Sequence, residues 1–167
     1  MSFHTDTEYN IDVEELFHEY SDMVYKIALV QMKNKNDTED ILQEVFLRLV
    51  KYSKKLESKE HAKAWLIRVT QSCCKQHYLS SWYKNTTALK EELPTKELFN
   101  EQESILYEAV MELPLKYRTA IHLYYYEGYS VSELAKVLNK KENTIKSHLF
   151  RARSMLKDTL KGGVDFE

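Results

Sequence analysis

Glycine and proline, the residues that most often interrupt helices, occur only three times and twice in the 167 residues of this chain. Strand-like alternation of apolar and polar residues is nearly absent, whereas apolar residues recur at intervals of three and four. These two features predict an all-α fold. A chain of this length holds either one ordinary domain or two small ones.

The periodic segments fall into two groups. The first group predicts helices over residues 12–32, 37–52 and 59–82, with Asp12 (paired with Glu15) and Asp37 as N-terminal caps. Residues 84–102 are polar and acidic, contain Pro94 and show weak periodicity, which is typical of a linker. We therefore expect two small helical domains joined by a flexible linker, with boundaries at residues 9–85, 86–102 and 103–161.

The strongest local motif spans residues 128–157. Ser130 and Glu133 have the spacing of a capping box, and Asn139 tolerates the left-handed conformation that a tight turn needs. A short capped helix, a turn and a longer helix form a helix-turn-helix, whose second helix fits the major groove. The candidate DNA-contacting residues on that helix are Glu142, Asn143, Thr144, Lys146, Ser147, His148, Arg151 and Arg153.

Charge is unevenly distributed, although the net charge is only −2. Residues 51–85 hold 8 basic and 2 acidic side chains, and residues 130–161 hold 8 basic and 3 acidic ones. Residues 1–50, with 4 basic and 11 acidic side chains, and residues 86–114, with 2 and 7, are acidic. Two basic segments separated by acidic ones are typical of two DNA-facing surfaces, but charge alone is equally consistent with ordinary variation of a solvated surface.

Several classes of function find no support in the sequence. The sequence shows no phosphate-binding loop, zinc-protease motif or nucleophile elbow, so we expect neither enzymatic activity nor a cofactor. The adjacent Cys73 and Cys74 suit neither a structural disulfide nor a metal site and are expected to be buried thiols. No apolar run has the length of a membrane span and no signal peptide is evident, which predicts a cytoplasmic protein.

The C-terminal segment resembles the promoter-reading domain of the extracytoplasmic-function (ECF) sigma factors. TIKSHLFRAR is similar to that family's Thr-Val-Lys-Ser-Arg-Leu-Ser-Arg-Ala-Arg, and ELPLKYRTAIHLYYYEGYS holds its leucine-proline, tyrosine-arginine and closing glycine. The resemblance implies that this domain reads the minus-thirty-five element and rests on the polymerase β flap. It also assigns Arg118 to that DNA contact. His148 replaces the usual arginine, and Asn139-Lys140 replace the common glycine-isoleucine.

The segment DTEDILQEVFLRLV, residues 37–50, predicts a docking surface. Four of its side chains form one stripe at helical spacing, apart from the buried one: Asp40, Gln43, Glu44 and Leu47. Taken alone, such a stripe is more typical of a solvated helix than of a docking surface. The same segment is similar to the Asp-x-x-Gln-Glu-x-Phe through which sigma factors bind the clamp helices of the polymerase β′ subunit.

The third motif is the basic, aromatic stretch HAKAWLIRVTQSCCKQHYLSSWYK. Trp65, Leu66, Arg68 and Val69 match the family's Trp-Leu-x-Arg-Ile, in the region that reads and opens the minus-ten element, and Trp65 is expected in the core. The candidate DNA contacts are Lys63, Arg68, Ser72, Lys75, Gln76 and His77. Ser72 and Gln76 stand where asparagine and aspartate are frequent in the family.

Taken together, the resemblance implies a sigma factor that works with core RNA polymerase and promoter DNA and is held in check by an anti-sigma factor. Two other classes stay open at this point. A stand-alone helix-turn-helix regulator would bind a palindromic operator without polymerase. A helical adaptor would never touch DNA.

Overall fold

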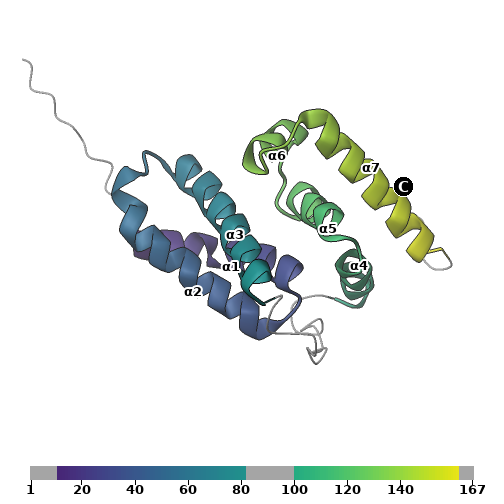
Figure 1. Ribbon diagram of the computed structural model, residues 1–167, viewed down its shortest axis with the longest axis horizontal. Coiled ribbons are helices and arrows are strands. Elements are labelled where there is room, and N and C mark those ends of the chain that lie inside the picture. The colour runs from purple at the N-terminus through teal and green to yellow at the C-terminus, as the bar shows by residue number, and fades with distance from the viewer. Residues whose placement is uncertain (1–10, 82–99, 162–167) are drawn as a thin grey trace, which may run out of the picture.

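The computed structural model describes residues 11–81 and 100–161, and all regular structure in these two ranges is helical. The first range forms a three-helix bundle, and the second folds into a separate helical unit beside it (Figure 1). The all-α prediction is confirmed. The expected linker, residues 86–102, falls mostly outside the described residues, although α4 already includes its last two positions.

The N-terminal bundle consists of α1 (Val13–Met32), α2 (Lys35–Tyr52) and α3 (Lys59–Ser81), with the short 3-10 turn η1 (Ser53–Lys55) after α2. Its centre is made of fully buried aliphatic side chains, including Val24, Val45, Leu49 and Leu66. Trp65 is only partly buried and stacks on Tyr52, with 5.1 Å between the ring centroids. Close packing of this kind fixes the orientation of the outward faces of α2 and α3.

Two caps differ from the sequence prediction. Asp12 caps α1 as expected, but its side chain accepts a hydrogen bond from the Glu14 amide, with no contribution from Glu15. The cap of α2 is Asn34, whose Oδ1 accepts from the Asp37 amide at 2.8 Å, so Asp37 lies inside the first turn. The left-handed Lys33 (φ 62°) ends α1 so abruptly that α2 can begin at once.

The C-terminal unit consists of α4 (Glu101–Met111), α5 (Leu115–Ile121), the π-helical turn η2 (His122–Tyr126), α6 (Val131–Val137) and α7 (Glu142–Thr159). Asn100 and Glu103 form a capping box at the start of α4. Pro114 is the N-cap of α5. Gly128, with φ of +72°, lies just after η2, where glycine adopts at little cost the left-handed conformation that ends a helix.

The two units are in contact. Helices α5 and η2 lie against α1, and α6 lies against α3. A small apolar cluster at this joint unites Leu29 and Val30 of α1 with Tyr107 and Met111 of α4. The expectation of two units is met, but in this arrangement they pack against each other.

Candidate nucleic-acid interfaces

The helix-turn-helix has the geometry that the sequence predicts. Ser130 Oγ accepts from the Glu133 amide at 3.1 Å, and Glu133 Oε2 accepts from the Ser130 amide at 2.8 Å, so the capping box is complete. After α6 the chain turns at Asn139, which has the left-handed φ of 52°. Lys141 then occupies the N-cap position of α7 without a side-chain hydrogen bond. The first turn of α7 is thereby left open toward solvent.

Helix α7 has one buried and one exposed face. Ile145, Leu149, Ala152 and Leu156 pack inward. Of the predicted DNA contacts on this helix, Thr144 and His148 are half-buried and the others are exposed: Glu142, Asn143, Lys146, Ser147, Arg151 and Arg153. This polar and basic face is therefore accessible to a groove of DNA.

Tyrosines hold the two arginines of this face. Arg153 Nε donates to Tyr125 Oη at 2.6 Å, and its guanidinium also lies over the ring of Tyr124. A hydrogen bond from Arg151 to Tyr117 lowers the pKa of that tyrosine and raises the pKa of Arg151. Since both guanidinium groups are pre-oriented, less rotamer freedom is lost when they meet a phosphate.

His148 differs in charge from the arginine usual at its position. Burial lowers its pKa, and Lys116, Lys140 and Arg151 lower it further by repulsion. Its ring packs edge-on against Tyr117, with 5.5 Å between centroids. At neutral pH, His148 therefore offers a neutral imidazole in place of a cation.

Phe150 is a residue that the sequence reasoning missed. It is 71% exposed, the most exposed of the large hydrophobic side chains in the part of the chain that the structure describes. On a helix it shares a face with Asn143, Lys146 and Ser147. A bulky apolar group at the centre of a basic face can contact a thymine methyl group. Its spacing from these three residues could have identified it.

On α3, Arg68, Ser72 and Lys75 are exposed at intervals of four and three residues, which places them on one stripe. Gln76 and His77 lie toward α2, where Gln76 Oε1 accepts from Arg48 at 2.9 Å and His77 Nε2 is 3.0 Å from Asp37. The stripe and this pair form separate parts of the predicted minus-ten surface.

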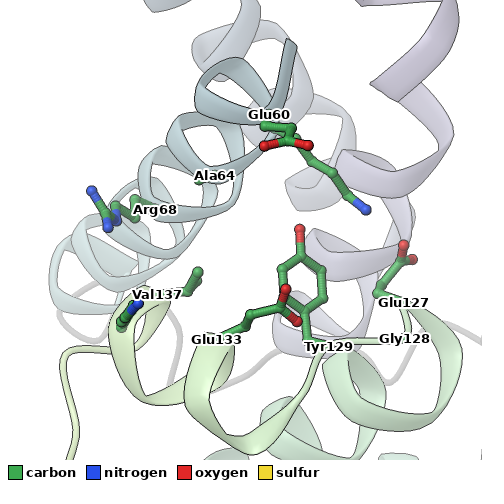
Figure 2. Close-up of a pocket in the computed structure, with 10 residues that line it drawn as sticks. Glu60, Ala64, Arg68, Glu127, Gly128, Tyr129, Glu133 and Val137 are labelled. Carbon is green, nitrogen blue, oxygen red and sulfur yellow. The ribbon is translucent and has the colours of Figure 1, made fainter. Parts of the chain in front are cut away.

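The remaining predicted residue on α3, Lys63, faces the second unit. Its ammonium lies 5.0 Å from the centroid of the Tyr129 ring, and a cleft of ≈ 400 Å³ separates this part of α3 from α6. Figure 2 shows Tyr129 pointing toward α3 across this cleft, with Glu133 on the α6 side. Lys63 and the neighbouring Arg68 therefore border the joint between the two units.

The predicted docking stripe on α2 is fully outward-facing. Asp40, Gln43, Glu44 and Leu47 are all exposed, Leu47 to 60%. Val50, also 60% exposed, extends the apolar part by one turn and was not predicted. Glu44 Oε1 accepts from Arg48 Nε at 2.9 Å. An exposed apolar centre with acidic neighbours suits a protein partner.

Arg118 is not placed as predicted. Its side chain is 3% exposed, and Nη1 donates to the carbonyl oxygens of Met111 at 3.2 Å and Leu113 at 3.1 Å. Nη2 donates to the carbonyl of Gln31, in α1, at 3.4 Å. In this arrangement Arg118 cannot contact DNA, because the N-terminal bundle covers it.

Other features of the described residues support no further chemistry. Cys73 and Cys74 are free and buried, as expected, and burial raises the pKa of Cys74 to about 12. The described residues contain no cluster of side chains that could hold a metal ion. None of their helices is both long and apolar enough to cross a membrane.

Comparison with known proteins gives the family. Residues 16–83 match the model described as Sigma-70 region 2, and residues 103–156 match the one described as Sigma-70, region 4. The ECF RNA polymerase sigma factor SigM of Bacillus subtilis (strain 168) is 30% identical over 166 residues, which cover 93% of this chain and 99% of SigM. The chain belongs to the ECF sigma factors. As an RNA polymerase sigma factor it directs promoter-specific initiation of transcription and is not an enzyme.

Further matches agree on the family and the fold. SigX of Bacillus subtilis (strain 168) is 27% identical over 155 residues, covering 85% of this sigma factor and 80% of SigX. In solved structures, RpoE of Bartonella quintana, crystallised with the anti-sigma factor NepR, matches with a TM-score of 0.74 at 18% identity, covering 90% of this sigma factor and 98% of RpoE. CnrH, solved with the cytosolic domain of CnrY, matches with a TM-score of 0.66 at 18% identity, covering 91% and 89%. The two solved structures support the all-α fold.

Proposed function

We propose that the exposed faces of α2, α3 and α7 each contact a different partner during initiation. The stripe on α2 docks on the β′ clamp helices of core polymerase. The stripe of Arg68, Ser72 and Lys75 on α3, with Gln76 and His77 beside it, contacts the minus-ten element during opening. The exposed face of α7 reads the minus-thirty-five element while its domain rests on the β flap.

A single observation supports this division. Each of the three helices buries an apolar stripe and turns most of the residues expected from the family pattern outward, in the order that the pattern requires. Because the two DNA-facing surfaces are basic and the docking surface on α2 is acidic around Leu47, each face is chemically suited to its proposed partner.

Polymerase is needed because each of the two basic faces, on α3 and α7, binds DNA only weakly by itself. The whole chain carries a net charge of −2, so its basic faces attract DNA only modestly and with a steep dependence on salt. When polymerase holds both faces in place, binding of one face to DNA raises the effective concentration of the other at its own promoter element. We expect the free sigma factor to bind promoter DNA weakly at physiological salt and the holoenzyme to bind it well.

Run-off transcription with purified core polymerase tests this proposal. A promoter library should give transcripts only when the sigma factor is present, and Lys146→Ala should lower transcription from the selected promoters without changing which minus-thirty-five sequence is selected. Lys157→Ala, on the same helix but beyond the predicted base contacts, is the matched control. Tight, specific promoter binding by the free sigma factor in a gel-shift assay would contradict the proposal.

We also propose an anti-sigma factor as regulator and the cytoplasm, where polymerase works, as the place of action. RpoE and CnrH, which share the fold, were solved in complex with NepR and with the cytosolic domain of CnrY. Co-purification of a tagged sigma factor from its native cells, followed by inhibition of run-off transcription with the captured protein, tests this. A captured protein that leaves transcription unchanged would count against it.

A further inference from the structure

Gln76, one of the predicted minus-ten contacts, is tied to the neighbouring helix. Its side chain is exposed on α3, three residues after the buried Cys73. Its Oε1 accepts a hydrogen bond from Arg48 Nη2, on α2, at 2.9 Å. The two residues are 28 positions apart in the chain and lie at a groove of ≈ 400 Å³ that residues of both helices line. The position of the Gln76 side chain is therefore set by α2 as well as by its own helix.

Arg48 is itself held in place on α2. Its Nε donates to Glu44 Oε1, four residues earlier, at 2.9 Å. Side chains four residues apart on a helix are neighbours, so this contact needs no distortion of the helix. With Nε bound to Glu44 and Nη2 bound to Gln76, the planar guanidinium has little freedom to rotate. Arg48 is thus a fixed donor at the edge of the groove.

The chemistry of arginine determines which way the Gln76 amide points. A guanidinium has five N–H donors and no acceptor, and it keeps its charge at any physiological pH. If the amide turned over, its NH₂ group would face Arg48 and two donors would meet. The carbonyl oxygen must therefore face Arg48, and Nε2, with its two N–H donors, is turned away from it. Because Gln76 is exposed, these donors are accessible to a partner.

An acidic residue at this position would present the opposite chemistry. Aspartate, which is frequent there in the family, has only acceptor oxygens when it is ionised. If one oxygen accepted from Arg48, the other would face outward with a negative charge and would repel a phosphate. Glutamine presents donors in its place. The substitution therefore changes the kind of atom that this position can contact.

The neighbouring minus-ten candidate, His77, is also held from α2. Its Nε2 lies 3.0 Å from Asp37 Oδ1. Both side chains thus take their orientation from the helix that carries the docking stripe. Since Glu44 belongs to that stripe, Glu44, Arg48 and Gln76 connect the surface proposed for polymerase with the surface proposed for DNA.

We propose that Arg48 is a positioning residue for minus-ten recognition: it holds Gln76 Oε1 so that Gln76 Nε2 donates a hydrogen bond to an acceptor atom of the minus-ten strand. This inference rests on the proposed function. The acceptor is either a phosphate oxygen or an atom on a base edge, both of which amide groups contact in protein–DNA complexes. Arg48 itself does not contact DNA and acts only through Gln76.

Two substitutions separate positioning from a merely structural role. Arg48→Met removes the donors but keeps a long side chain, so the Gln76 amide is free to turn over. Gln76→Glu keeps an acceptor for Arg48 but has no donor to offer to DNA. A structural bridge would survive Gln76→Glu, whereas the proposed contact would not. The matched control is Lys35→Met, which removes an ion pair with Glu39, four residues along α2, and does not line the groove.

The measurement is holoenzyme binding to forked promoter probes with a single-stranded minus-ten region, followed by fluorescence anisotropy. Each probe carries one change: a methylphosphonate, which replaces a charged phosphate oxygen by a methyl group, or an abasic nucleotide, which removes every acceptor of one base. At one position the loss of affinity should be several-fold larger for the parent and for Lys35→Met than for Arg48→Met and Gln76→Glu, because these two have already lost the contact. A methylphosphonate at that position identifies a phosphate oxygen as the acceptor, and an abasic site identifies a base.

The possible failures can be told apart. Equal losses for the parent and Gln76→Glu at every position would show that Gln76 donates to no acceptor of this strand, and the inference would be wrong. A folded Arg48→Met variant that responds to the probes as the parent does would leave the contact but remove Arg48 from its positioning. Gln76→Glu decides the contact even if Arg48→Met folds poorly. Absence of transcripts from the parent with core polymerase would refute the proposed function itself.

Discussion

Among the side chains on α7, His148 is the one whose charge state has the largest expected effect on DNA binding. Burial lowers its pKa below the ordinary value of 6.5, and repulsion from Lys116, Lys140 and Arg151 adds to the effect, so the imidazole is mainly neutral at pH 7. A cation in contact with a phosphate strengthens binding and steepens its salt dependence.

We therefore predict that His148→Arg tightens holoenzyme binding to the minus-thirty-five element at pH 7.5 by several-fold and raises the slope of log K against log salt by about 0.9. His148→Gln, which stays neutral, should match the parent at this pH. Fluorescence anisotropy with a labelled promoter between 50 and 200 mM salt, about the range in which such slopes are resolved, measures both. A parent with the same affinity as His148→Arg would contradict the neutral state.

Lowering the pH should strengthen DNA binding by the parent, as His148→Arg does at pH 7.5. Because the pKa of His148 is lowered in the folded protein, binding should change little between pH 8 and pH 7 and strengthen mainly as the pH falls below 6.5. His148→Gln lacks this response and so separates it from titration elsewhere. A parent whose affinity changes between pH 8 and pH 7 would show that another group is responsible.

Single residues also show where sequence reasoning ends. The faces of α7 could be predicted because exposure on a helix follows from spacing alone. The burial of Arg118 could not, because its covering contact, the Gln31 carbonyl, is 87 residues away in sequence. Phe150 could have been recognised from its spacing but was overlooked among polar neighbours.

At the scale of helices, a cap could be predicted where only one suitable residue stood at the required spacing. Ser130 had a partner at the required spacing, and the capping box is present. For α2, Asp37 was expected as the cap, but Asn34 is the cap because the left-handed Lys33 ends α1 directly before it, and no local pattern indicated that conformation. The π-helical turn at His122–Tyr126 had no sequence signal either.

Loss of the α6 cap should loosen the helix-turn-helix. Ser130→Ala removes the acceptor for the Glu133 amide, and such caps are worth about 1 kcal/mol. We predict a decrease of about 1 kcal/mol in the free energy of unfolding, measured by urea denaturation. The control is Ser132→Ala, at an exposed position in the same turn. Equal stability of the two variants would show that the capping box contributes little.

The docking stripe can be probed without loss of fold. Leu47 is 60% exposed, so Leu47→Ala should leave the melting temperature unchanged. If Leu47 fills a pocket on polymerase, its truncation costs about 1–2 kcal/mol, or roughly tenfold in affinity. Biolayer interferometry with core polymerase measures this, with Lys35→Ala, off the stripe on the same helix, as control. Wild-type affinity of Leu47→Ala would remove Leu47 from the interface.

At the scale of the molecule, the two basic faces should act as independent readers once polymerase separates them. Lys75 on α3 and Lys146 on α7 are both exposed, and in the holoenzyme they would meet two separate promoter elements. Substitutions more than about 10 Å apart that share no partner usually have additive free energies. We predict that Lys75→Ala and Lys146→Ala each weaken promoter binding by the holoenzyme and lower its salt slope by about 0.9, and that the double variant shows the sum of both effects.

The free sigma factor provides a control for this prediction, because only α7 then has a DNA target. Offered a duplex with the minus-thirty-five element alone, the chain should respond to Lys146→Ala and not to Lys75→Ala, because α3 has no target there. Holoenzyme on the full promoter should respond to both. Strong non-additivity in the holoenzyme would mean that the two faces act as one surface, which only units still packed together could form, and the division of promoter reading between α3 and α7 would then be wrong.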